Sequence, residues 1–403
     1  MAVKVDKKHD FTAKLRQPLV LPRVKDYVKW QKAIRQGIKV ETPNLTPISI
    51  NLDLTTACTY RCPHCIDLDI IQKKSKYNHN ALMDSLKNMI ECGLRSVIII
   101  GGGEPTLYQK FEEVVRFLKD FGIQVAIVSN GSRNKIIYEA VNCFNGKDWV
   151  RLSIDAGTNE TFRKMHKPRN PISLEEICSW IPRIRERNPK TPIGFSFIIT
   201  WEGAENGKGD VITPNIDEIV LAAKLAREYD FNYISYKPFL TRFADGEEVM
   251  NPEVISDLNQ IISRIRNAIN EAKTLESGNF KIIESTNLRV LEEKNWNDFR
   301  KQPPICHIQA FRQVLSPIGL FNCPGYRGME KSLIAPENAY ESPKKITGTI
   351  KRTATLLTNF DASQECANVT CLFNPVNWWI EKLITGELDI DTVEIAEEHD
   401  YFF

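Results

Sequence analysis

The stretch Ile48-Ser-Ile-Asn-Leu-Asp-Leu54 is followed, after three residues, by Cys58-Thr-Tyr-Arg-Cys62-Pro-His-Cys65. The first segment is a short apolar run, which is typical of a buried strand. A loop that leaves the end of such a strand can bring three closely spaced thiols together. The pattern therefore predicts a strand that delivers Cys58, Cys62 and Cys65 to one metal site.

The rest of the chain up to residue 250 repeats this strand-and-loop pattern, because apolar runs alternate with amphipathic stretches. We predict strands over residues 48–54, 96–100, 124–129, 149–154, 193–200 and 233–237. We predict helices over residues 80–91, 110–121, 135–144, 174–187 and 217–229. Six such units in sequence favour a parallel α/β barrel or an open, doubly wound sheet, and both folds place active loops at the carboxyl ends of the strands.

The sequence divides into four regions. Residues 1–47 form a basic extension, since the first 40 residues hold 11 Lys or Arg against 3 Asp, and residues 48–250 form the barrel. Residues 251–302 are expected to be a helical connection, and the pair Pro303-Pro304 opens a turn-rich unit over residues 303–403.

The basic extension contains Val24, Tyr27, Val28, Ile34 and Ile38, which could form one face of a helix. One interpretation is that this basic extension binds an acidic partner. A solvated helix packed on the barrel is favoured, because charge runs usually mark exposed faces.

Composition narrows the class of protein. Of 403 residues, 42% are hydrophobic and 26% charged, with a net charge of +2, which argues against a disordered chain and against nucleic acid as a partner. Val97 to Ile100 is the longest run of Val, Leu and Ile, far short of a membrane span, so we expect no membrane partner. The charged start has no apolar secretion signal, so we expect a cytoplasmic protein with reduced cysteines.

Two metal centres fit the first three cysteines. A 4Fe-4S cluster normally takes four cysteine ligands, so three would leave one iron free as a reaction site. A zinc site completed by His64 or His79 is the alternative, because three thiolates and one imidazole suit tetrahedral zinc.

A second motif, Gly101-Gly-Gly-Glu-Pro105, follows the second predicted strand. With this pair of motifs the sequence resembles the radical S-adenosylmethionine (radical SAM) superfamily, in which such a three-cysteine loop follows the first strand of a partial barrel. The resemblance implies a partial (β/α)6 TIM-like barrel with S-adenosylmethionine (SAM) bound to the cluster. It also implies that Gly102, Gly103, Glu104 and Pro105 line the methionine end of SAM and that His64 flanks the adenine.

Polar residues close the third and fourth predicted strands. By the same resemblance, Ser129 and Asn130, and Ser153 and Asp155, would contact the carboxylate and ribose of SAM. Capping of the following helices is the other role open to Ser, Asn and Asp at these positions.

Four more cysteines lie in the carboxyl-terminal unit: Cys306, Cys323, Cys366 and Cys371. Their arrangement resembles the SPASM and shorter twitch domains of radical SAM enzymes, which implies one auxiliary 4Fe-4S cluster with no free iron. A structural zinc site with four thiolates is the alternative.

The resemblance implies an oxidoreductase that cleaves SAM to a 5′-deoxyadenosyl radical and abstracts a hydrogen atom from substrate. Dehydrogenation or rearrangement of a polar small molecule is expected, with the auxiliary cluster relaying electrons and flavodoxin or ferredoxin as a low-potential donor. Peptide modification is an alternative, and an iron–sulfur electron carrier or zinc-binding module is an alternative of another class. Tyr236, Lys237, Arg242 and Arg312 are candidate substrate contacts.

Overall fold

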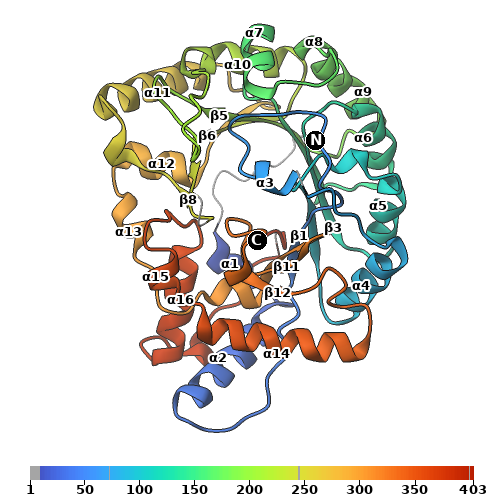
Figure 1. Cartoon of the computed structure of the whole chain (residues 1–403), viewed down its shortest axis with the longest axis vertical. Helices are drawn as coiled ribbons and strands as arrows, with labels where there is room; N and C mark the ends of the chain where they lie inside the picture. The colour runs from blue at the N-terminus through green and yellow to red at the C-terminus, as the bar shows by residue number, and fades with distance from the viewer. Residues whose placement is uncertain (1–9, 72, 244–245, 399) are drawn as a thin grey trace.

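The computed structural model describes residues 10–71, 73–243, 246–398 and 400–403, and its main feature is a ten-stranded sheet curved into an open barrel (Figure 1). Seven strands lie parallel and side by side in chain order. They are β1 (Ser49–Leu52), β2 (Ser96–Ile99), β3 (Gln124–Ser129), β4 (Trp149–Ser153), β5 (Ile193–Ile199), β6 (Tyr233–Pro238) and β9 (Lys281–Glu284). The predicted α/β partial barrel is confirmed.

Helices cover the outer face of this sheet (Figure 1). They are α4 (His79–Glu91), α5 (Phe111–Asp120), α6 (Asn134–Ala140), α7 (Asn159–His166), α8 (Leu174–Cys178), α9 (Trp180–Arg187), α10 (Ile219–Glu228), α11 (Leu258–Lys273) and α12 (Thr286–Glu293). Side chains alternate along each strand. In β4, Val150 and Leu152 are fully buried in the apolar core, whereas Trp149, Arg151 and Ser153 keep part of their surface exposed on the inner face.

The segment 251–302 is more than the helical connection expected from sequence. It contains α11, α12 and α13 (Trp296–Arg300), but also β9, which pairs in parallel with β6 and extends the barrel by one strand.

The carboxyl-terminal unit continues the same sheet. Strand β10 (Arg312–Ser316) pairs in parallel with β1, and β11 (Gly319–Phe321) and β12 (Leu333–Ala335) follow antiparallel. The unit also holds α14 (Pro343–Asn359), α15 (Ala362–Glu365) and α16 (Asn374–Thr385). Because β10 pairs with β1, the unit that carries the second cysteine group is joined to the first strand of the barrel.

The amino-terminal helices α1 (Phe11–Leu15) and α2 (Leu21–Arg35) pack on this carboxyl-terminal unit. The Tyr27 ring lies edge-on to Phe311, and the Arg35 guanidinium pairs with the Glu381 carboxylate at 2.7 Å. Burial of Val24, Tyr27 and Val28 agrees with the predicted helix face, but Ile38 lies beyond the helix and is 52% exposed. Helix α2 therefore packs against α16 and its neighbours and not against the outer helices of the barrel.

The carboxyl-terminal tail closes the amino end of the barrel, and Figure 1 marks the C-terminus inside the ring of strands. Ser96 Oγ donates to the Tyr401 carbonyl at 2.6 Å, and the Tyr401 amide donates to Gln124 Oε1 at 2.8 Å. Phe402 packs against Trp149, and the Phe403 amide donates to Ser49 Oγ at 3.3 Å. Each partner in the barrel is the first residue of its strand, so the tail forms the floor.

Among the described residues, no helix is both long enough and apolar enough to cross a membrane.

Candidate functional site

The three predicted ligands Cys58, Cys62 and Cys65 lie on the loop between β1 and α3 (Leu68–Ile71), and none forms a disulfide. Burial raises the pKa of all three thiols, that of Cys65 to about 12, and the charges of Cys65 and Cys58 raise that of Cys62 further. Three thiolates that repel one another in a buried place favour a bound cation, so this donor set fits a metal centre.

The backbone of the cysteine loop is fixed to two other loops. The Glu104 amide donates to the Ala57 carbonyl at 2.7 Å, and the Arg61 amide donates to the His166 carbonyl at 3.0 Å. These bonds place the loop against the carboxyl ends of β2 and β4.

Histidine placement changes the zinc hypothesis. Both ring nitrogens of His79 have partners outside the site, Tyr108 and Glu113, each at 2.9 Å. His64 stays close to the cysteines, and donor atoms of Cys62, His64 and His166 lie within 4.8 Å of one another. His79 is therefore no candidate ligand, whereas His166 is a neighbour that sequence reasoning missed.

His166 could have been found from the spacing of α7, because it shares a helix face with Phe162, four residues before it, and that face is buried. Its Nδ1 lies 3.2 Å from Cys62 Sγ, and its Nε2 lies 2.6 Å from the Ile154 carbonyl. Burial lowers the pKa of His166 to about 4, so the imidazole is neutral near pH 7.

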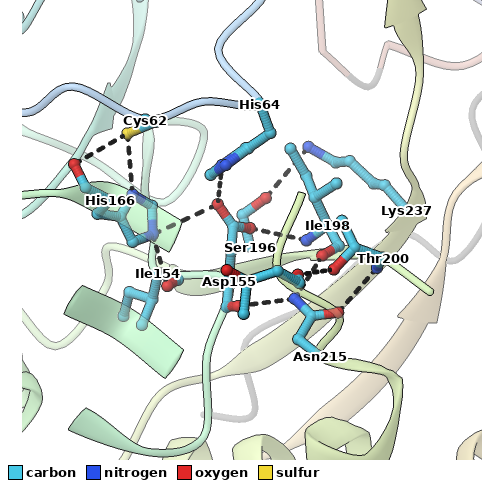
Figure 2. A network of polar contacts seen from close by, with 11 residues as sticks. Cys62, His64, Ile154, Asp155, His166, Ser196, Ile198, Thr200, Asn215 and Lys237 are labelled. Atoms are coloured by element: carbon cyan, nitrogen blue, oxygen red, sulfur yellow. Dashed lines mark hydrogen bonds and ion pairs between the residues drawn. The ribbon is translucent and has the colours of Figure 1, made fainter. Parts of the chain in front are cut away.

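Asp155 organises the polar network beside these histidines (Figure 2). Its Oδ2 lies 3.3 Å from His64 Nε2 and 3.5 Å from His166 Nε2, and its Oδ1 accepts from the Ile198 amide at 2.7 Å. Burial by itself would raise the pKa of Asp155, but the hydrogen bonds from His64 and from the Ile198 amide hold it below its usual value. Asp155 is an anchor for both imidazoles.

The glycines of the second motif pack directly on the cysteine loop. A Cβ on Gly103 would lie 2.3 Å from the Ala57 carbonyl oxygen, and a Cβ on Gly102 would lie 2.8 Å from the Asp53 carboxylate. Gly102 also has φ of +77°, which favours glycine. The structure thus brings the two motifs together.

Glu104 joins the β2 and β3 loops. Its carboxylate accepts hydrogen bonds from the Thr106 amide and hydroxyl, from Ser129 Oγ and from the Asn130 amide, at 2.6–3.1 Å. Pro105 begins a short 3-10 helix, Pro105–Leu107, directly after it. Glu104 and Ser129 therefore bind each other inside the protein.

The two remaining candidate SAM contacts are placed differently. Asn130 Nδ2 donates to Thr59 Oγ1 at 3.0 Å and lies 3.7 Å from Cys58 Sγ, so it touches the cysteine loop. Ser153 lies on the inner face of β4 and is partly exposed. Asn130 therefore lies beside the cysteines, and Ser153 faces the barrel interior.

The structure places the four candidate substrate contacts in different surroundings. Tyr236 is fully buried and its hydroxyl donates to the Ile219 carbonyl of α10, so it points outward and not toward a substrate. Burial lowers the pKa of Arg312 to about 10, and the nearby charges of Cys323 and Cys371 oppose that shift. Arg242 donates to the Ile66 and Arg327 carbonyls, and Lys237 alone reaches into the barrel (Figure 2).

Arg242 also lines a cavity of about 200 Å³ at the mouth of the barrel. His64, Cys65 and Phe243 line the same cavity, so it opens beside the cysteine loop. Asn206 covers one side, where its Nδ2 donates to the Pro63 carbonyl at 3.0 Å. This cavity gives access to the site.

Arg327, from the loop between β11 and β12, ties the carboxyl-terminal unit to the cysteine loop. Its Nε lies 2.9 Å from Asp53 Oδ2, and its Nη1 lies 2.7 Å from Asp67 Oδ2. Burial would lower the pKa of Arg327, but the charges of Asp53 and Asp67 raise it above its usual value. The Gly102 amide donates to the same Asp67 oxygen at 3.1 Å, so one ion-pair network spans both units.

The second cysteine group converges from four separate elements. Cys306 precedes a 3-10 helix (His307–Ala310), Cys323 follows β11, Cys366 follows α15 and Cys371 precedes α16. Burial raises the pKa of every one of these thiols, and the charges of Cys306, Cys323 and Cys371 raise that of Cys366 further. All four are free thiols, so this donor set also fits a metal centre.

Comparison with known proteins agrees with this geometry. Residues 52–205 match the family model described as the radical SAM superfamily. An S-adenosylmethionine-dependent nucleotide dehydratase of Thermoplasmatales archaeon (strain ISO4-H5) is 35% identical over 109 residues, which cover 27% of this chain and 38% of that protein. A protein of the same name from Psychrobacter lutiphocae is 29% identical over 167 residues, covering 38% of this chain and 55% of that protein. The chain thus spans about half the length, or less, of these curated relatives.

Solved structures share the fold over most of the chain. Streptococcus suis SuiB aligns with a TM-score of 0.55 at 13% identity and covers 86% of this chain and 82% of its own. The enzyme anSMEcpe, with bound AdoMet and Cp18Cys peptide, aligns with a TM-score of 0.50 at 14% identity and covers 88% and 93%. The cysteine loop and the glycine motif both fall inside residues 52–205, the part of the chain that matches the radical SAM superfamily.

Proposed function

We propose that Cys58, Cys62 and Cys65 hold a 4Fe-4S cluster and that SAM binds beside it against Gly102 and Gly103. The observation that carries this proposal is the contact between the two motifs, where a Cβ on Gly103 would lie 2.3 Å from the cysteine-loop backbone. When bound, the cluster supplies the electron that cleaves SAM to methionine and a 5′-deoxyadenosyl radical, which takes a hydrogen atom from substrate.

The residues of the chain position the cofactor and shield the reaction. Asp155 fixes His64, the expected neighbour of the adenine, and Asn130 contacts both Thr59 and Cys58. Orientation and exclusion of water are what a protein contributes to a radical step.

We propose a polar, anionic small molecule as substrate, and the names of the sequence relatives favour a nucleotide. Dehydration of a nucleotide and the dehydrogenation expected from the sequence require different numbers of electrons. The second cysteine group is relevant to the dehydrogenation. Its four buried thiols suit an auxiliary cluster without a free iron, which would relay electrons rather than bind substrate.

The test is anaerobic incubation of iron-reconstituted protein with SAM and dithionite, with and without a panel of nucleotides and peptides. Release of 5′-deoxyadenosine, together with ~8 irons per chain, is expected for two clusters. A reconstituted protein that binds iron but releases no 5′-deoxyadenosine under any of these conditions would refute the proposal.

A zinc site is the second candidate, because donor atoms of Cys62, His64 and His166 lie within 4.8 Å of one another. Zinc coordination by one thiolate and two imidazoles is chemically ordinary. Metal analysis of protein purified without air decides between the two: zinc without iron supports this site, and iron supports the cluster.

A further inference from the structure

Two cations lie on the inner face of the barrel on nearby strands. Arg151 is the middle residue of β4, and Lys237 is near the end of β6. Their neighbours in sequence, Val150 and Leu152 beside Arg151 and Tyr236 beside Lys237, are fully buried on the outer face. Alternation along a strand therefore directs Arg151 and Lys237 into the barrel, where both keep part of their surface exposed.

Neither cation has an acidic partner among the described residues. The Arg151 guanidinium lies 5.2 Å from the Trp149 ring. It makes no hydrogen bond or ion pair with any described residue. Lys237 Nζ contacts Ser196 Oγ at 3.3 Å (Figure 2). Asp155 is the acid within electrostatic reach of both, but its oxygens already contact the Ile198 amide and two imidazoles.

Two other deeply placed lysines among the described residues are paired with acids. Lys119 lies 2.8 Å from the fully buried Asp148, and Lys14 pairs with Asp400. In contrast, burial and the charge of Arg151 together lower the pKa of Lys237 to about 7. Cations kept in a protein interior without a counter-ion are costly, so their retention points to a ligand that supplies the negative charge.

The position of this pair separates it from the expected methionine end of SAM. Gly102 and Gly103 follow β2, whereas β4 and β6 are two and four strands farther along the sheet, or ~10 and ~19 Å around its curve at ~4.8 Å per strand. Ser153 and Ser196 are register partners on β4 and β5 and lie between the two cations. Their hydroxyls add donors to the same wall of the barrel.

We propose that Arg151 and Lys237, with Ser153 and Ser196 between them, form a subsite for a phosphate-type oxyanion of the substrate. The identity of the substrate as a nucleotide rests on the proposed function, but the subsite itself is a claim about anion binding. The methionine carboxylate of SAM is the other source of an oxyanion, and the experiment separates the two.

The experiment measures binding to iron-reconstituted full-length protein by calorimetry. The probes are SAM, a panel of nucleoside triphosphates, the corresponding nucleosides and inorganic pyrophosphate. The variants are Arg151→Met, Lys237→Met and the double variant, with Lys224→Met as a control of equal charge change on the exposed side of α10.

Each single variant should weaken triphosphate binding ~10- to 100-fold, as expected for loss of a hydrogen bond to a charged group. SAM and nucleoside affinity, and all binding by Lys224→Met, should match the parent. Unchanged triphosphate affinity in the double variant would overturn the subsite. Loss of SAM affinity instead would assign the cations to the cofactor and overturn the substrate assignment.

Inorganic pyrophosphate keeps this test independent of the proposed function. Pyrophosphate should raise the melting temperature of the parent and not that of the double variant, even if no nucleotide is a substrate. No such stabilisation of the parent, or a double variant that melts well below the parent without ligand, would refute anion binding in favour of a structural role.

Discussion

The two cysteine groups are built in opposite ways. Cys58, Cys62 and Cys65 come from one loop, whereas Cys306, Cys323, Cys366 and Cys371 come from four elements spread over 66 residues of sequence. The first loop is held by backbone hydrogen bonds to Glu104 and His166, while the second group is surrounded by apolar side chains such as Tyr326 and Phe360. A local site can lose its metal and keep its fold, but a site that joins distant elements contributes to the fold itself.

The largest effect should come from replacing all three loop cysteines. The Cys58→Ala, Cys62→Ala, Cys65→Ala variant should release no 5′-deoxyadenosine and should retain ~4 irons in the second group. Its far-UV circular dichroism should match the parent, since the loop keeps its backbone bonds. Persistent 5′-deoxyadenosine formation would exclude this loop as the radical site.

Removal of the second group should mainly affect stability. The Cys366→Ala, Cys371→Ala variant should lose ~4 irons and become sensitive to proteolysis after residue 303, while the first cluster still cleaves SAM. Limited proteolysis and iron analysis measure both effects. A protease-resistant variant with full product yield would show that the group neither supports the unit nor relays electrons.

Arg327→Met tests whether the two regions depend on each other. It leaves the carboxylates of Asp53 and Asp67 without their buried partner, which should cost ~3–5 kcal/mol of the free energy of unfolding. Lys331→Met, four residues later at a partly exposed ion pair with Glu365, is the control and should cost ~1 kcal/mol or less. Equal losses in urea titrations would contradict a special role for Arg327.

Gly103→Ala sharpens the comparison within the first region. The new Cβ should displace the cysteine loop, because the Ala57 carbonyl would be 2.3 Å away, and overpacking of this kind costs ~1–3 kcal/mol. SAM affinity should fall with it. Gly348→Ala on α14, where a Cβ meets open space, is the matched control, and equal SAM affinity in the two variants would show that the contact is unimportant.

The smallest effect concerns Lys237 and pH. Its folded pKa of about 7 is below the unfolded value of 10.5, so the folded state binds fewer protons between these values and parent stability rises with pH through that window. Arg151 and Asp155 are the charged groups that act on it, and Ser196 is its hydrogen-bond partner. Without ligand, Lys237→Met should exceed the parent in stability at pH 6, with the difference shrinking toward pH 10.5. Urea titrations at both pH values measure it, and a constant difference would contradict the shifted pKa.

Much of the barrel could be predicted because its signals are local. The six predicted strands agree with β1 to β6 to within two residues at every end, since each is an apolar run followed by an amphipathic helix. Strand β9 was missed because Lys281–Glu284 is four residues long with charged ends, and its place in the sheet comes from pairing with β6.

The site was predictable to the extent that its residues are close in sequence. The contact of Gly102 and Gly103 with the cysteine loop followed from motif order, but His166 is 104 residues from Cys62 and carries no motif. Tyr236 and Arg312 were misplaced for a related reason. Residue type suggested substrate contact, whereas strand alternation turns Tyr236 outward and the fold of the second cysteine group surrounds Arg312.

The barrel floor has a consequence for how the protein folds. The hydrogen bond from the Phe403 amide to Ser49 joins residues 354 positions apart, and Tyr401 reaches β2 and β3 across comparable separations. Contacts of such high sequence separation form slowly, because a long loop must close before they contribute. Hydrogen exchange during refolding should therefore show early protection of the amides of β3 to β6 and late protection of those of Tyr401 and Phe403. Until the floor is in place, the inside of the barrel should be open to water from its amino end.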